Sequence, residues 1–215
     1  MAVTFLPPDL EREPCGVTVG VAAGASDIEH VAESFRGLVD IRSISESSSA
    51  DGYDVVFRQS ENRQEVEILL PCGDNQPSEH RILVSVAVSP FPALDSIAHA
   101  VLAPAFASGG VGIDWGDVCR ILRSGTHGVL AVVESGEAVT DTLRLAESVL
   151  AQQSSARVSG MMAAVFAPRG TGWMESVRQL GRAAETLAPN AGRLVAAPII
   201  LGDAPVCAVL AVFPE

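Results

Sequence analysis

Apolar residues recur along this chain with two different periods, which predict strands alternating with helices. Short runs rich in β-branched and apolar residues are typical of strands that are buried in a sheet. These runs lie at 17–22, 53–58, 66–70, 81–88, 126–134, 158–167, 193–201 and 206–213. Apolar residues spaced three and four apart predict helices. Such helices begin at Ser26 or Asp27, with Glu29 at capping-box spacing from Ser26, and cover 92–107, 137–152 and 173–187.

The stretch 91–124 organises the rest of the chain. It holds a long helix with an apolar face, a break at Ser108, Gly109 and Gly110, and a second helix that opens at Asp114. Pro104 is expected to bend the long helix or to end it early. Strands precede this stretch, and a strand, helix, strand, helix, strand, strand series follows it, which predicts an α/β fold. We expect two small lobes, each a mixed sheet with flanking helices, joined by this central helix.

The same pattern suggests where the chain divides. Residues 1–16 are rich in proline and mixed charge and read as a leader. Residues 17–90 form a reduced N-terminal α/β lobe, 91–111 hold the central helix and the break, and 112–215 form the C-terminal α/β domain. The predicted core helix side chains are Leu94, Ile97, Val101 and Leu102.

Composition excludes several classes of function. The 215 residues are 48% hydrophobic and 19% charged, as in a globular protein. The net charge is −12 and every basic residue is an arginine, so the clusters of cations that nucleic-acid binding requires are missing and no nucleic-acid partner is expected. No apolar run is long enough for a membrane span, and the start lacks the pattern of a signal peptide, which predicts a cytoplasmic protein.

The residues that commonly bind metals are scattered. Cys15, Cys72, Cys119 and Cys207 lack the paired spacing of zinc or redox sites, so we interpret them as reduced thiols. The four histidines also lack metal spacing, and we expect them to have structural or solvent-facing roles. They are His30, His80, His99 and His127. The sequence therefore predicts no metal site.

A small-residue turn follows the first predicted strand. Gly20 and Gly24 could form a phosphate cradle together with the start of the next helix. However, Ala22, Ala23 and Ala25 place methyl groups where such a loop needs bare backbone, and no lysine follows. We interpret it as a tight turn between packed elements and expect no bound cofactor.

Two acids open the second helix of the central stretch, and two interpretations of them stay open. Asp114 followed by Asp117 is an ordinary arrangement for capping a helix and complementing its dipole, and Asp117 can pair with Arg120. Trp115, Cys119 and Leu122 share one face of this helix, which indicates packing. The alternative is that the acids take part in chemistry or contact a partner.

The second interpretation comes from a family resemblance. Residues 112–122, GIDWGDVCRIL, resemble the catalytic loop of the FtsZ/tubulin family, whose pattern is Asn-x-Asp-Phe-x-Asp-Val. Asp114 and Asp117 match the two acids, Trp115 the aromatic residue and Val118 the apolar residue, while Gly112 replaces the asparagine. The resemblance covers roughly residues 91–214, which are similar to the central helix and the C-terminal (activation) domain of bacterial FtsZ. The first half departs from the family, whose Gly-Gly-Gly-Thr-Gly-Thr-Gly signature is absent from the chain.

The resemblance implies a function for the loop. In the family, the loop reaches into the nucleotide pocket of the next subunit and orients the attacking water. A chain that keeps the loop without a pocket of its own could still dock on another subunit. We therefore expect an FtsZ-like protein without GTPase activity and without catalytic residues, which interacts with cell-division FtsZ filaments or assembles with itself. The expected interface residues are Gly112, Asp114, Trp115, Asp117 and Arg120.

Other functions stay open at this point. The chain could be a small-molecule-binding protein or an enzyme of unknown reaction on an FtsZ-like scaffold, because a fold does not fix a function. It could also be a divergent GTP-binding FtsZ homologue.

Overall fold

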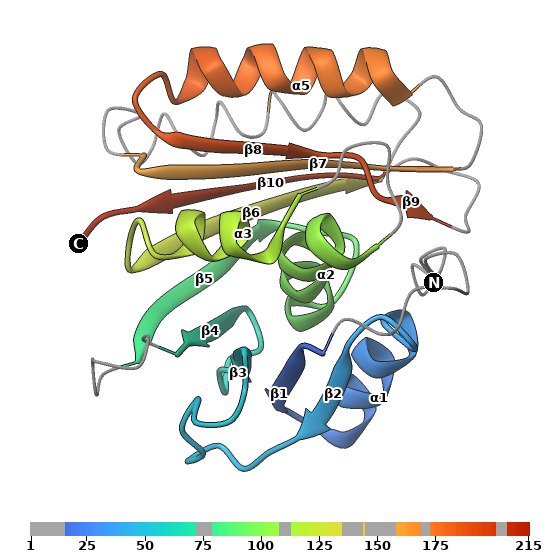
Figure 1. The fold of residues 1–215 in the computed structure, drawn as a ribbon, viewed down its shortest axis with the longest axis vertical. Helices are drawn as coiled ribbons and strands as arrows, with labels where there is room; N and C mark the ends of the chain where they lie inside the picture. Colours follow the sequence, from blue (N-terminus) through green and yellow to red (C-terminus); the bar gives the residue numbers. More distant parts are fainter. Residues whose placement is uncertain are drawn as a thin grey trace.

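The strands of this chain form one mixed sheet. The computed structural model describes residues 16–71, 79–107, 113–134, 144, 158–168, 173–200 and 206–215. The strand order is β2-β1-β3-β4-β5-β6-β10-β7-β8, and β9 pairs with β7 (Figure 1). The strands are β1 (Thr18–Ala22), β2 (Asp40–Ser43), β3 (Val55–Gln59), β4 (Glu65–Leu70), β5 (His80–Val88), β6 (His127–Glu134), β7 (Gly160–Pro168), β8 (Gly192–Ala196), β9 (Ile199–Ile200) and β10 (Val206–Phe213).

Helices cover both faces of the sheet. They are α1 (Ala25–Ser34), α2 (Ala93–Phe106), α3 (Trp115–Leu122) and α5 (Trp173–Leu187). The first three share a hydrophobic core on one face, and α5 packs on the opposite face against β7 and β8 (Figure 1). The helix predicted over 137–152 lies outside the described residues, except for Arg144, which is helical. The predicted α/β fold of mixed sheet and flanking helices is confirmed.

A strand pair joins the two halves of the chain. β5 runs parallel to β6, with Leu83 opposite His127 and Val86 opposite Leu130. The strands before and after α2 are therefore edge to edge in one continuous sheet, so the halves are linked by this pair as well as by the central helix. The boundaries predicted at residues 16, 90 and 111 stay predictions.

β10 shows how the second half is organised. It lies between β6 and β7 and is antiparallel to both. All eight of its residues are buried, because alternate side chains enter the α2 face and the α5 face. A strand that is covered on both faces needs a continuous apolar sequence, and VCAVLAVF provides one.

The central helix α2 is buried almost throughout. Leu94, Ile97, Val101 and Leu102 have no exposed area, as the sequence predicted. The helix contacts β3, β4 and β5 from the first half and β6, β7 and β10 from the second. Pro104 lies inside the helix, which ends two residues later at Phe106. The helix therefore spans the line where the two halves meet.

Two local predictions need correction. The helix expected to begin at Ser26 or Asp27 begins at Ala25, and Gly24 is its N-cap without a side-chain hydrogen bond. The carbonyl of Gly24 accepts hydrogen bonds from the amides of Asp27 and Ile28, so the helix closes before Ser26 can cap it. β2 was missed because DIRS has a polar edge-strand sequence, and its pairing with β1 forms it.

The turn between α3 and β6 passes very close to the end of β10. The amide of Thr126 donates to the carbonyl of Phe213 at 3.0 Å. A Cβ atom on the preceding Gly125 would lie 1.9 Å from that same oxygen. Only glycine allows this approach, which fixes the end of α3 against the sheet.

We expect truncation of the central helix to destabilise the whole protein. Val101→Ala and Leu102→Ala should each lower the free energy of unfolding by about 2–4 kcal/mol, because each leaves a cavity in the core. Urea denaturation measures this loss. The control is Leu83→Ala, since Leu83 is 37% exposed and should cost less than about 1 kcal/mol. Losses below about 1 kcal/mol at both core positions would contradict the burial of α2.

We expect Gly125→Ala to be costly as well, with a loss of about 3 kcal/mol, because the new methyl group meets backbone that cannot move without breaking the Thr126 hydrogen bond. Gly181→Ala is the matched control. Gly181 lies in α5, where a Cβ would meet only Val195 at 3.9 Å, so this variant should gain up to about 1 kcal/mol in helix propensity. The melting temperatures of the two variants test this expectation. Equal changes in melting temperature would contradict the close approach of Gly125 to the Phe213 carbonyl.

Candidate functional site

The acidic start of α3 is a capped helix terminus. Asp114 has extended backbone angles, φ −90° and ψ 155°, and its carboxylate accepts a hydrogen bond from the amide of Asp117 at 3.2 Å. Its carbonyl accepts from the same amide at 3.1 Å. The capping interpretation of Asp114 is therefore confirmed, and its side chain is also exposed.

Charged and apolar residues separate onto opposite faces of α3. Arg120 pairs with Asp117 at 2.7 Å, and the two side chains are 77% and 36% exposed. Val118 and Leu122 are fully buried and Cys119 is nearly so, while Trp115 is half-buried and packs against the same core. The shared packing face predicted from the sequence is confirmed. The fifth predicted interface residue, Gly112, lies outside the described residues.

Trp115 fixes the start of α3 to the end of α2. Its ring centroid lies 5.4 Å from that of Phe106, with the rings tilted by 37°. Aromatic pairs at this separation add to the stabilisation that burial provides. The two acids are therefore held on a helix that cannot easily rotate.

The other end of α3 is held by residues that sequence reasoning did not connect with it. Nε2 of His80, at the start of β5, lies 3.2 Å from the carbonyl oxygen of Leu122 and 2.9 Å from that of Gly125, and can donate to them. Arg123 donates to the carbonyl of Pro71 at 2.8 Å. A histidine beside the last carbonyls of a helix is a favourable C-terminal partner. The expected structural role of His80 is found here.

The turn after β1 has a chemistry unsuited to phosphate. Gly20, which the sequence assigned to the turn, lies inside β1, and a Cβ there would meet Ile44 and Val56 at 3.0 Å, so side chains already cover this glycine. At the helix start, Oδ2 of Asp27 lies 3.2 Å from where a Cβ of Gly24 would be. A carboxylate therefore faces the helix terminus that would otherwise attract an anion.

A buried carboxyl group lies where α1 meets α2. Asp95, in the first turn of α2, is 5% exposed, and Nε2 of His30 lies 3.6 Å from its Oδ2. Burial raises the pKa of Asp95 above its ordinary value, the charge of His30 lowers it and that of Asp27 raises it. Sequence reasoning did not bring these residues together, because they lie on different helices.

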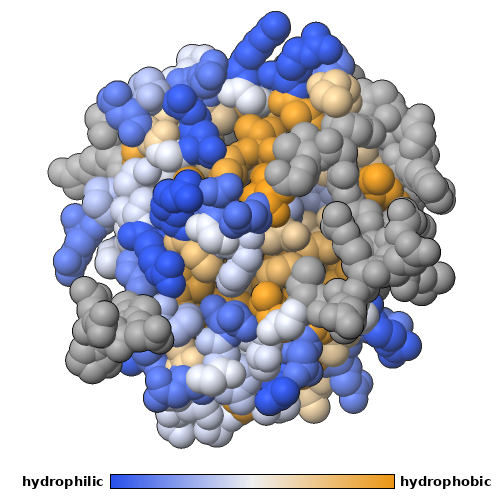
Figure 2. Space-filling model, viewed as in Figure 1, coloured by the Kyte–Doolittle hydropathy of each residue, from blue (hydrophilic) through white to orange (hydrophobic). Residues whose placement is uncertain are grey.

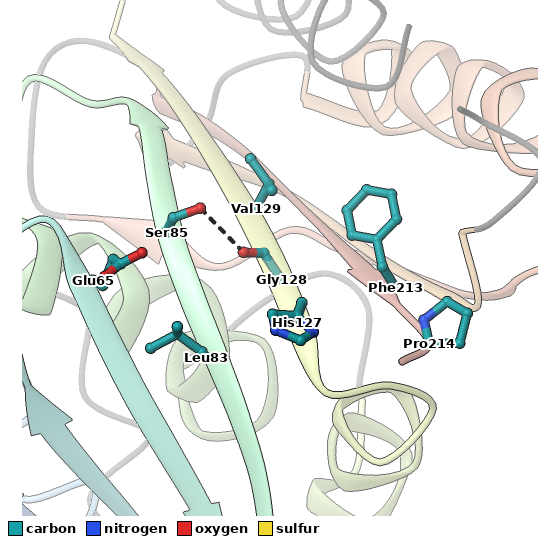
Figure 3. A pocket seen from close by; sticks show the side chains of 8 residues that line it. All are labelled: Glu65, Leu83, Ser85, His127, Gly128, Val129, Phe213 and Pro214. Atoms are coloured by element: carbon teal, nitrogen blue, oxygen red, sulfur yellow. Dashed lines mark hydrogen bonds between the residues drawn. The ribbon is translucent and has the colours of Figure 1, made fainter. Parts of the chain in front are cut away.

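A pocket of about 260 Å³ opens on the sheet face opposite α2, between the part that α5 covers and β4 (Figure 3). Strand pairing places two rows of side chains across it. Glu65, Ser85 and Val129 form one row on β4, β5 and β6, and Leu83, His127 and Phe213 form the other on β5, β6 and β10. Alternation along β5 and β6 was the only signal in the sequence.

The described part of the chain contains neither a cluster of metal ligands nor a cysteine that is exposed and activated. Its His, Cys, Asp and Glu residues form no group of three or more that could hold a metal ion. Cys119 and Cys207 are buried and are not joined in a disulfide, and burial raises the pKa of Cys119 to about 11, which keeps its thiol protonated. Cys15 and Cys72 lie outside the described residues. None of the helices described is both long and apolar enough to cross a membrane.

Comparison with known proteins finds likenesses only among solved structures. No protein-family model and no curated protein matches the chain. The empty FtsZ dimer of M. jannaschii is 17% identical, with a TM-score of 0.42 over 55% of this chain and 35% of that one. The type III plasmid segregation protein TubZ is 11% identical, with a TM-score of 0.41 over 94% of this chain and 57% of that one. TubZ in GDP-form protofilaments of Bacillus thuringiensis serovar israelensis is 12% identical, with a TM-score of 0.39 over 94% of this chain and 55% of that one.

These values describe a distant and partial likeness. The chain spans between 35% and 57% of the length of these structures. The site is therefore argued below from its own residues.

We expect the Asp114 cap to contribute measurably to stability. Asp114→Ala should lower the free energy of unfolding by about 1 kcal/mol, since it removes the acceptor for the Asp117 amide. Asp114→Asn should cost much less, because asparagine caps about as well as aspartate. Chemical denaturation of the two variants separates the outcomes. Equal losses would mean that charge rather than capping is what matters at this position.

Proposed function

We propose that this chain docks through the start of α3 onto a subunit of an FtsZ-like filament or onto a second copy of itself, without hydrolysing GTP. The observation that carries the proposal is the fixed display of Asp114 and Asp117. Both carboxylates reach solvent, while Trp115 and the buried face hold the helix beneath them in place. The interface is completed by Arg120 and, from the resemblance, by Gly112.

Rigid display favours binding because little freedom is lost when a partner docks. α3 is held at its start by Phe106 and at its end by His80. The half-buried apolar residue Ile113 directly precedes Asp114 in the sequence. In the view of Figure 2, which shows the side of α2 and α3, hydrophobic surface lies in the middle among hydrophilic residues. An apolar centre with a polar rim is the usual composition of an interface.

The absence of hydrolysis is proposed from the β1–α1 turn. Phosphate binding there would place the anion beside the carboxylate of Asp27 with no lysine to compensate. In the docked state the nucleotide would belong to the partner. Carboxylates at the contact could then orient water near its phosphates.

Sedimentation with FtsZ polymers, and of the protein alone, tests the docking. Asp114→Asn and Asp117→Asn should each weaken association at least about fivefold, because each removes a charge from the contact. The matched control is Glu175→Gln. Glu175 pairs with Arg178 on α5 with the same three-residue spacing as Asp117 and Arg120, so this variant should associate like wild type.

Two outcomes would contradict the proposal separately. If both α3 variants associate like wild type and keep its melting temperature, the two acids have no role in docking and only the helix cap explains them. Saturable GTP binding or phosphate release by the isolated chain would instead refute the non-hydrolysing part and favour a divergent GTP-binding protein.

A further inference from the structure

The strand β2 leaves one edge of the sheet open. It is the last strand on its side, and among the described strands it pairs only with β1 (Figure 1). The amide of Asp40 donates to the carbonyl of Val17 at 3.0 Å, so the main-chain groups of Asp40 face β1. These groups alternate in direction along a strand, so those of Ile41 and Ser43 point away from β1. No residue that the structure describes hydrogen-bonds to them.

The side chains of β2 separate onto the two faces of the sheet. Ile41 is half-buried and packs on the core that α1 and α2 share with the sheet. Asp40 and Arg42 lie on the opposite face, with 55% and 58% of their side chains exposed. Within one chain, Nη2 and Nε of Arg42 lie 2.6 and 2.9 Å from Oδ2 of Asp40. The open edge therefore displays an acid and a base on either side of Ile41.

The order of these charges makes the edge complementary to itself. Charged side chains usually protect an open edge strand, because like charges meet when two edges approach. The order Asp-Ile-Arg has the opposite effect in one arrangement. When two β2 strands run antiparallel about a two-fold axis at Ile41, each Asp40 lies opposite the partner's Arg42. Opposite charges that face each other across a strand pair stabilise the pair.

Charge also selects the register of this pairing. Ile41 faces outward, so at the two-fold axis it can exchange both of its main-chain hydrogen bonds with the partner's Ile41. A shift by two residues keeps the outward groups opposite each other, but it sets Arg42 opposite the partner's Arg42, or Asp40 opposite the partner's Asp40. Like charges in these positions repel. Only the register centred on Ile41 combines the hydrogen bonds with two ion pairs.

The other edge of the sheet lacks this complementarity. β8, whose sequence is GRLVA, contains no acid, so two copies of it form no ion pair across a strand pair. Its one charged side chain, Arg193, donates from Nη1 to the carbonyls of Ala188 and Pro189. Self-pairing is therefore favoured at β2 and not at β8.

We propose that two copies of this chain associate through β2, as an antiparallel strand pair about a two-fold axis at Ile41 that joins their two sheets into one. A two-fold contact uses the same surface of both copies and closes on itself, so the product is a dimer. The contact is separate from the docking surface on α3, which lies against β7 and β8 in the other half of the sheet, and it does not depend on the function proposed above.

Sedimentation equilibrium of the full chain tests the dimer through its charges. Wild type should form a dimer that weakens with salt, because the ion pairs are exposed. Asp40→Arg and Arg42→Asp should each weaken dimerisation about tenfold, since each sets like charges opposite each other at two places. The double variant Asp40→Arg/Arg42→Asp exchanges the charges and should return to within about twofold of wild type.

The matched control is Asp51→Arg. Asp51 is exposed and accepts a hydrogen bond from Ser49, so this variant changes the net charge as much as Asp40→Arg does, away from β2. It should dimerise like wild type. A wild-type chain that stays monomeric, or a double variant that dimerises no better than the single ones, would overturn the proposal. Self-association that is lost in Asp114→Asn but kept in Asp40→Arg would overturn it as well, and would support docking through α3 instead.

Disulfide trapping tests the register independently. Facing residues of a non-hydrogen-bonded antiparallel pair have Cα atoms about 4.5 Å apart, which is close enough for a disulfide. Asp40→Cys and Arg42→Cys are made in separate chains, in which Cys15 and Cys72 are replaced by serine. When the two are mixed and oxidised, they should form a linked dimer with one chain of each kind, which mass spectrometry identifies.

Each of these variants alone should give little linked dimer, because its new thiol faces an unchanged arginine or aspartate of the second copy. Equal yields from the mixture and from the separate samples would overturn the register centred on Ile41. The absence of any linked dimer would overturn the strand pairing itself.

Discussion

The rest of the structure depends on α2, which is buried across the line where β5 pairs with β6. One helix covers strands from both halves of the chain, and its apolar residues, such as Leu94 and Val101, have no exposed area. The strand pair beneath it makes the sheet continuous. Because the interior is closely packed, a displacement of either half would disturb contacts with the other. The two halves are thus coupled through a single core.

This coupling determines how the functional surface is presented. α3 follows α2 directly and is held by Phe106 at one end and by His80, a residue of β5, at the other. Its acids are therefore positioned by both halves of the sheet, although they are on the surface. At the start of α2, Asp95 faces α1, so the same helix carries a titratable contact near one end and leads to the acidic loop at the other.

Carboxylates have different tasks in the different environments of this chain. Asp114 is exposed and caps a helix, whereas Asp95 is buried, with Nε2 of His30 lying 3.6 Å from its Oδ2. Asp27 lies at a helix start where anion-binding proteins would leave bare backbone, which makes this turn a place for a side chain rather than for phosphate. A chain with a net charge of −12 can thus contain carboxylates whose roles depend on burial and neighbours rather than on number.

The sequence by itself determined the elements whose signal is local. The apolar run of β10, the period of α5 and the cap at Asp114 are found where the pattern placed them, because each depends on neighbours in the chain. Tertiary structure decided what depends on distant partners. β2 has a polar sequence and exists through its pairing with β1, and His80 reaches α3 through the fold. The meeting of His30 with Asp95 and the rows of side chains in the pocket likewise arise from packing and strand register, for which no stretch of sequence carries a local pattern.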